Sequence, residues 1–136
     1  MNEQGEELNL KKTTYASAHG MYVDRNVSTA ADVATLCHHA MKISRFREIV
    51  KVAHRETPSY SFPGHTYIWD NTNHLLTKET NCTGIKTGVT WAAGPCLAAS
   101  LKVDNYNICI VVLACSTMNA RWHEVPKIVN WGVKKI

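Results

Sequence analysis

Three apolar, strand-like segments follow one another in the second half of the chain, and they constrain the fold more than any other feature. They span residues 85–90, 96–103 and 108–115. The last two are separated by Val103-Asp104-Asn105-Tyr106, a sequence typical of the tight turn in a hairpin. The sequence therefore predicts an antiparallel meander of about three strands.

A well-marked helix precedes this meander. Thr29 is a suitable N-cap, and Asp32 can act as its capping-box-like partner near the positive end of the helix dipole. Apolar side chains then recur at helical spacing and form one stripe: Val33, Leu36, Cys37, Ala40 and Met41. Shorter helical segments are expected at residues 1–9 and 44–50.

The remaining segments are expected to connect and close the fold. Residues 13–26 should be irregular, residues 56–64 should form a loop, and a short strand is expected within residues 65–73. A helix should follow Ser116, where Pro126 predicts a kink or a late start. Its apolar side would hold Trp122, Val125, Val129 and Val133.

This order of helices, meander and closing helix predicts an α+β arrangement. The 136 residues suffice for one domain with a real core, so we expect a single domain over residues 1–136. A meander of three strands also leaves an edge uncovered, and such sheets usually need further strands there.

Composition excludes several classes of function. The net charge of +4 comes without a Lys/Arg run, so a nucleic-acid partner is not expected, and no apolar stretch is long enough to span a membrane. The five cysteines are odd in number and lack Cys-x-x-Cys spacing, which favours a role as small apolar side chains. The seven histidines include no His-x-x-x-His pair, so neither a metal nor another cofactor is predicted.

The tripeptide Lys86-Thr87-Gly88 is the candidate motif for chemistry, although by itself it could be a solvated lysine at a strand end. A phosphate-binding loop is excluded, because that motif needs a glycine directly before its lysine, where this chain has Ile85. An acyl-transfer site has a physical basis instead. A peptide can add to an exposed strand edge, and Gly88 would leave its approach free. Lys86 would supply positive potential, while Thr87 and Thr90 would offer hydroxyls to a carboxylate.

Blocks along nearly the whole chain resemble the C-terminal portion of the serine-type D-alanyl-D-alanine carboxypeptidases, the low-molecular-mass penicillin-binding proteins. The similar blocks, in the family's order and spacing, are MNEQGEELNLKKTTYASAHGM, NVSTAADVATL, FREIV, YIWDNTNHLL, GIKTGVTWAAGPCLAAS, ICIVVLACS and ARWHEVPKIVNWGV. The resemblance implies part of a beta-lactamase/transpeptidase-like fold, with the family's first strands and nucleophile helix missing. It also implies a peptidoglycan stem peptide or a beta-lactam as ligand.

The resemblance assigns substrate binding to Lys86, Thr87, Gly88 and Thr90, which match the family's recognition strand. Arg121 matches an arginine suited to a bidentate carboxylate contact, with a surface residue that opens the last helix as the alternative. The segment 71–73, His19-Gly20 and Asp32 also match family positions, and we assign them structural roles. Some family members carry a polar residue where this chain has Val89, so the resemblance does not carry over the family's substrate preference in detail.

The family's nucleophile is a serine in Ser-x-x-Lys, and a Ser-x-Asn element completes its proton relay. No serine of this chain starts either motif; Ser44 comes nearest, with Arg47 three positions on. Arginine stays protonated and cannot act as the relay base. We therefore expect the C-terminal piece of a longer carboxypeptidase, with no catalytic residue of its own and no activity in isolation.

Two further expectations follow from the residues present. The uncovered sheet edge and an apolar face predict self-association, which light scattering would detect. A degenerate, non-catalytic module that binds a peptide or a partner is the alternative to an enzyme portion. The polar start, MNEQGEELNLKK, directs no export although the family acts outside the cytoplasmic membrane, so the sequence assigns no compartment.

Overall fold

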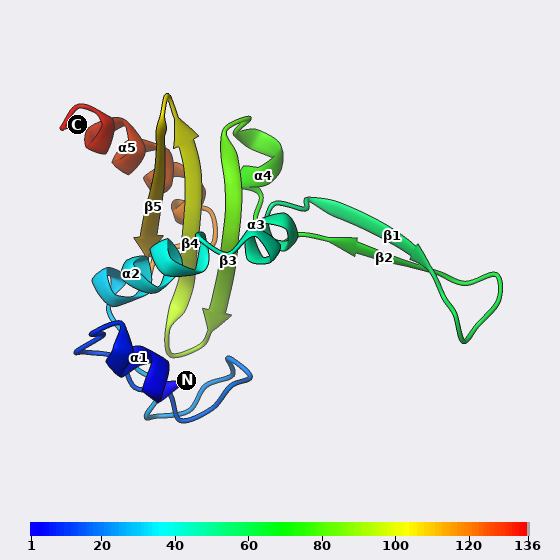
Figure 1. Cartoon of the computed structure of the whole chain (residues 1–136), viewed down its shortest axis with the longest axis horizontal. Coiled ribbons are helices and arrows are strands. Elements are labelled where there is room, and N and C mark those ends of the chain that lie inside the picture. Colours follow the sequence, from blue (N-terminus) through cyan, green and yellow to red (C-terminus); the bar gives the residue numbers. More distant parts are fainter. Residues whose placement is uncertain (136) are drawn as a thin grey trace.

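The computed structural model describes residues 1–135, and its larger sheet is the predicted meander (Figure 1). Strands β3 (Cys82–Thr90), β4 (Gly94–Val103) and β5 (Tyr106–Val112) pair antiparallel in the order β3-β4-β5. Asp104 takes a positive φ of 51° in the turn between β4 and β5, as tight hairpin turns require. β3 begins at Cys82 rather than Ile85, and β5 ends at Val112 rather than Cys115.

Helices cover both faces of this sheet, which makes an α+β layer arrangement (Figure 1). On one face, α4 (Leu75–Lys78) and α5 (Ala120–Val133) enclose the larger core. Its buried members are Leu75, Leu97, Ala99, Leu101, Ile110, Trp122, Val125 and Val129. On the other face, α2 (Ala30–Ala40) and α3 (Ser44–Val50) enclose a smaller core.

The predicted start of α2 is confirmed, but Asp32 has different partners from those expected. The Thr29 hydroxyl accepts the Asp32 backbone N–H at 3.2 Å, which is the N-cap bond. The Asp32 carboxylate accepts the Lys12 backbone N–H at 2.8 Å and the Thr13 hydroxyl at 2.7 Å. Asp32 therefore ties the preceding irregular segment to the start of α2.

Both terminal helices form where the sequence predicted them, and α5 follows its apolar pattern. α1 spans Asn2–Glu7, and α5 buries Trp122, Val125 and Val129 against the sheet. Pro126 lies inside α5, which begins at Ala120, so the predicted late start at this proline is wrong. Within residues 1–135, no helix has both the length and the apolar character needed to cross a bilayer.

A hairpin, of which the sequence predicted only the second strand, projects from the body of the molecule (Figure 1). β1 (His54–Pro58) pairs antiparallel with β2 (Thr66–Asp70), and we call residues 54–70 the arm. The strand expected within residues 65–73 is confirmed, whereas the loop expected from residue 56 is partly strand. Pro58 was a reason to predict a loop, but a proline at the end of a strand removes no hydrogen bond from the strand's interior.

Burial of Cys37 between α2 and the sheet predicts an unreactive thiol. Burial, with a smaller effect of nearby Cys109, raises the pKa of Cys37 to about 11. At pH 8 its thiolate fraction should then be on the order of a hundredfold below that of an exposed cysteine. Mass spectrometry after iodoacetamide treatment should show correspondingly slow alkylation of the folded chain. Urea should remove this protection, and equal rates with and without urea would contradict the prediction.

Candidate functional site

Strand β3 forms one edge of the three-stranded sheet and carries the tripeptide Lys86-Thr87-Gly88. Its partner β4 faces Lys86 with Ala98, Thr87 with Leu97 and Gly88 with Cys96. On its other side, β3 pairs with no strand among residues 1–135. Because no strand pairs there, that side of β3 can accept an added extended peptide.

Gly88 is an open point of this edge. A methyl group added there would have no heavy atom within 4 Å, apart from its chain neighbours. The Cβ of a larger residue would thus enter space that the protein itself does not fill. Glycine at this position keeps the surface of the strand accessible to a ligand's backbone.

The two side chains before Gly88 are held in different ways. Thr87 is 9% exposed, and its hydroxyl lies 2.6 Å from the hydroxyl of Thr72. Lys86 is exposed, and its ammonium donates to the Thr87 carbonyl at 2.5 Å. The positive charge therefore lies beside the open edge, while the Thr87 side chain is fixed against the segment before α4.

The segment 71–73 has the structural role that the sequence indicated. The Asn71 amide donates to the Val52 carbonyl at 2.9 Å, and its oxygen accepts the Asn73 backbone N–H at 2.9 Å. Asn73 is 1% exposed, and its side-chain oxygen accepts the Leu75 N–H at 3.2 Å. These bonds form the turn that places Thr72 against Thr87, a contact that sequence reasoning missed.

Arg121 is buried at the start of α5, so its interpretation as a surface residue is wrong. Its side chain donates to the Met118 carbonyl at 3.1 Å and to the Cys96 carbonyl at 3.2 Å. The guanidinium carbon also lies 4.5 Å from the ring centroid of Trp122. Cys96 of β4 pairs with Gly88 of β3. Arg121 is therefore bound to β4 at a position opposite the tripeptide.

The charge of Arg121 has no carboxylate partner within residues 1–135. A buried cation is costly unless it is paired, and carbonyl oxygens compensate it only in part. A carboxylate that reached the guanidinium would complete the compensation in a bidentate geometry. The charge of Arg121 therefore favours a carboxylate near the start of α5, beside β4.

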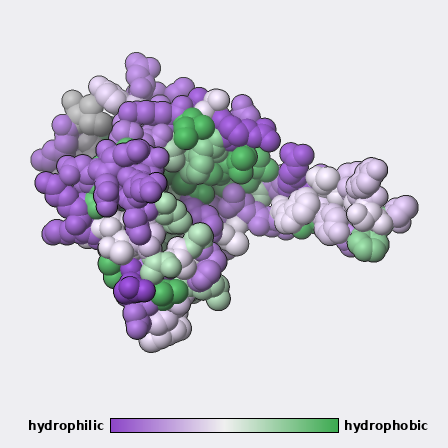
Figure 2. Space-filling model, turned by 60° about the horizontal axis from the view of Figure 1, so that its bottom comes forward, coloured by the Kyte–Doolittle hydropathy of each residue, from purple (hydrophilic) through white to green (hydrophobic). Residues whose placement is uncertain are grey.

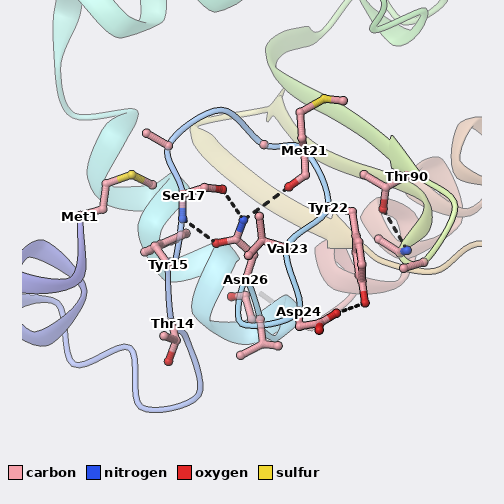
Figure 3. Close-up of a pocket in the computed structure, with 16 residues that line it drawn as sticks. Met1, Thr14, Tyr15, Ser17, Met21, Tyr22, Val23, Asp24, Asn26 and Thr90 are labelled. Carbon is pink, nitrogen blue, oxygen red and sulfur yellow. Dashed lines mark hydrogen bonds between the residues drawn. The ribbon is translucent and has the colours of Figure 1, made fainter.

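Thr90 lies apart from these groups, at the end of β3. Its hydroxyl accepts the Ala93 backbone N–H at 3.1 Å and so supports the turn into β4. The residue also lines a cavity of about 440 Å³ between that turn and residues 14–28 (Figure 3). The structure thus brings Lys86, Thr87 and Gly88 together, joins Arg121 to them through β4, and places Thr90 beside this cavity.

The cavity beside Thr90 is lined by the segment that the sequence predicted to be irregular, but the contacts that fold this segment were not predicted. The Asn26 side-chain oxygen accepts the N–H of Ala16 at 2.6 Å. It also accepts the N–H of Ser17 at 3.1 Å (Figure 3), and the two bonds fold this segment. Tyr22 packs on Trp91 of the β3–β4 turn, with ring centroids 4.7 Å apart. Hydrogen bonds from one asparagine and one aromatic contact give no periodic signal in a sequence.

Comparison with known families and structures agrees with this arrangement. The family model described as D-alanyl-D-alanine carboxypeptidase matches residues 1–117. Two similar curated proteins are the carboxypeptidases DacF of Bacillus subtilis, 31% identical, and DacC of Escherichia coli, 32% identical. The alignments cover 97% and 98% of this chain, but only 33% and 32% of those proteins.

Solved structures show the same fold. The DD-transpeptidase of Streptomyces K15 matches with a TM-score of 0.90 at 30% identity, over 98% of this chain and 52% of that one. Penicillin-binding protein D2 of Listeria monocytogenes, in its cefotaxime-bound form, matches with a TM-score of 0.83 at 25% identity. The expected beta-lactamase/transpeptidase-like fold is confirmed, and the chain spans about half the length of these structures.

Proposed function

Because the chain belongs to the D-alanyl-D-alanine carboxypeptidase family, we propose that it carries the substrate-recognition strand of a serine-type enzyme without the nucleophile. The open edge of β3 at Gly88, beside the ammonium of Lys86, is the observation that supports this proposal most directly. The substrate would be a peptidoglycan stem peptide that ends in D-Ala-D-Ala, and beta-lactams would occupy the same place.

In this proposal the stem peptide adds to β3 as an extra strand. Backbone hydrogen bonds to the free side of β3 hold it in an extended conformation, and Gly88 lets it approach closely. Lys86 supplies positive potential at the edge. Arg121, Thr87 and Thr90 are the groups assigned to the terminal carboxylate. This chain would then hold the groups that bind the substrate, but not the groups that cleave its peptide bond.

Covalent chemistry is expected to be absent, because the 136 residues hold no Ser-x-x-Lys and no Ser-x-Asn. Incubation with a fluorescent penicillin, followed by denaturing electrophoresis, should leave the chain unlabelled. A complete carboxypeptidase of the family, treated in parallel, should give a labelled band. A labelled band from this chain would show that it holds a nucleophile and would contradict this prediction.

Reversible binding should remain and can be measured by calorimetry with two short peptides. One ends in D-Ala-D-Ala and the other in L-Ala-L-Ala, so that they differ only in stereochemistry. We expect heat of binding from the D-Ala-D-Ala peptide and none from its counterpart. Equal binding of both peptides, or of neither, would contradict the proposal.

A non-catalytic module that serves another partner is the second candidate. The hydrogen bonds of Thr87 to Thr72 and of Arg121 to two carbonyls favour it, because these polar groups already have partners within the chain. Such a module has no reason to distinguish the two stereoisomers. The calorimetric comparison therefore separates the two candidate functions.

Self-association through the outer strands stays a prediction. β3 and β5 each pair on one side only within residues 1–135, and unpaired strand edges tend to pair with other chains. Light scattering should show a mass above that of one chain, 15.2 kDa, at high concentration. A strict monomer over the whole concentration range would contradict it.

A further inference from the structure

The arm carries a row of exposed aromatic rings along β2. The ring centroids of His65 and Tyr67 are 4.7 Å apart, and those of Tyr67 and Trp69 are 5.6 Å apart with an interplanar angle of 18°. Tyr67 is 39% exposed and Trp69 is 52% exposed. We call these three residues the ladder. They stand on the projecting arm, clear of both hydrophobic cores (Figures 1 and 2).

Polar donors flank the ladder on the same face of the hairpin. Arg55 lies directly opposite Trp69, and Thr57 lies directly opposite Tyr67. Residues opposite each other in an antiparallel pair project to the same side. The Arg55 side chain also donates to the Thr57 hydroxyl at 3.3 Å, which keeps both groups beside the rings.

The acidic side chains of the arm lie on its other face. Glu56 and Asp70 are the only carboxylates in residues 54–70. Both bond to the ring of His54, at 3.2 Å and 2.7 Å, and Ile68 shares their face. The ladder face therefore combines flat apolar rings and one guanidinium, without a negative charge.

The arm is also close to the recognition strand. Trp69 and Thr72 are three residues apart, so their Cα atoms are separated by at most about 11 Å. Thr72 is hydrogen-bonded to Thr87. An extended peptide of five residues spans about 17 Å. A peptide held on β3 can therefore reach back to a polymer that lies along the ladder.

We propose that the ladder binds the glycan chain to which the stem peptide is attached, an inference that rests on the proposed function. Sugar rings present flat C–H faces that fit aromatic faces, and their rims carry hydroxyls for Arg55 and Thr57. Of the two faces of the arm, only the ladder face offers a carboxylate of the glycan a positive charge, that of Arg55, without a carboxylate beside it. Symmetric pairing of two ladder faces is disfavoured, because neither face offers a carboxylate to Arg55.

The test measures binding of the full chain to glycan strands from which an amidase has removed the peptides. We expect Trp69→Ala to lower the affinity about tenfold, and Tyr67→Ala with Trp69→Ala to lower it further. Ile68→Ala is the matched control, because Ile68 is 60% exposed on the same strand but faces the other way. It should bind like the unchanged chain, and circular dichroism should show that all three variants are folded.

The same variants, tested with the short D-Ala-D-Ala peptide, separate this inference from the proposed function. Loss of glycan binding with peptide binding retained supports a separate glycan site. Failure of the unchanged chain to bind the peptide would contradict the proposed function instead. Unchanged glycan affinity in the double variant, or an equal loss in Ile68→Ala, would overturn the inference. So would dissociation of a dimer by the ladder variants, because the ladder would then pair with a second copy.

Discussion

Gly88→Val is expected to lower the affinity for a D-Ala-D-Ala peptide about five- to 150-fold without destabilising the fold. The added side chain would occupy space that the protein leaves open at β3 and that the bound peptide needs. Overpacking of a well-fitted contact by the added carbon atoms costs about 1–3 kcal/mol of binding free energy, which lowers the affinity roughly five- to 150-fold. Valine also suits an extended strand, so the folded state gains no strain.

Calorimetry with the peptide and urea unfolding of the same variant would check this expectation. Val89→Ala is the matched control, because Val89 is adjacent, 51% exposed and not assigned to substrate binding. It should change affinity much less than Gly88→Val. Peptide binding that survives Gly88→Val unchanged would mean that the ligand does not approach β3 at this point.

Arg121→Ala is expected to lower the free energy of unfolding by about 2–4 kcal/mol. The guanidinium is buried, and its removal leaves the carbonyls of Cys96 and Met118 without these donors. Each lost bond to a charged donor is worth about 1.5–3 kcal/mol. Relief from burying an unpaired charge offsets part of that loss. Urea unfolding would measure the result.

Two comparisons distinguish this role from a general effect of charge. Lys127→Ala removes an exposed cation from the same helix and should change stability by less than about 0.5 kcal/mol. Arg121→Lys keeps the charge but lacks the planar fork, so it should recover only part of the stability. An Arg121→Ala variant as stable as the unchanged chain would refute the structural role of these two bonds.

Local patterns were sufficient to predict the elements that depend on neighbours in sequence. The meander, the turn at Asp104, the Thr29 cap and the apolar side of α5 all come from periodicity or turn chemistry. β1 was missed because only its partner β2 has strand-forming residues in a row, and a hairpin strand gains its order from that partner. Its identification needs the pairing itself.

The residues of the candidate site also fall into those that the sequence indicated and those that only the folded chain reveals. Lys86, Thr87 and Gly88 could be singled out because they are contiguous and stand in a family-like order. Arg121 was found by resemblance, but its burial could not be foreseen, since a helix pattern does not reveal which carbonyls lie above its first turn. The bond between Thr72 and Thr87 joins residues 15 apart, and only the folded chain brings their hydroxyls together.

The sequence by itself determined the three-stranded meander, the main helices, the family and the candidate tripeptide Lys86-Thr87-Gly88, because spacing and turn chemistry along the chain carry these features. The tertiary structure alone decided that Arg121 is buried without a carboxylate partner among residues 1–135, that Thr72 is hydrogen-bonded to Thr87, and that the arm presents its aromatic rings on one face. These properties arise when distant segments pack. They are properties of surfaces, and surfaces exist only once the chain has folded.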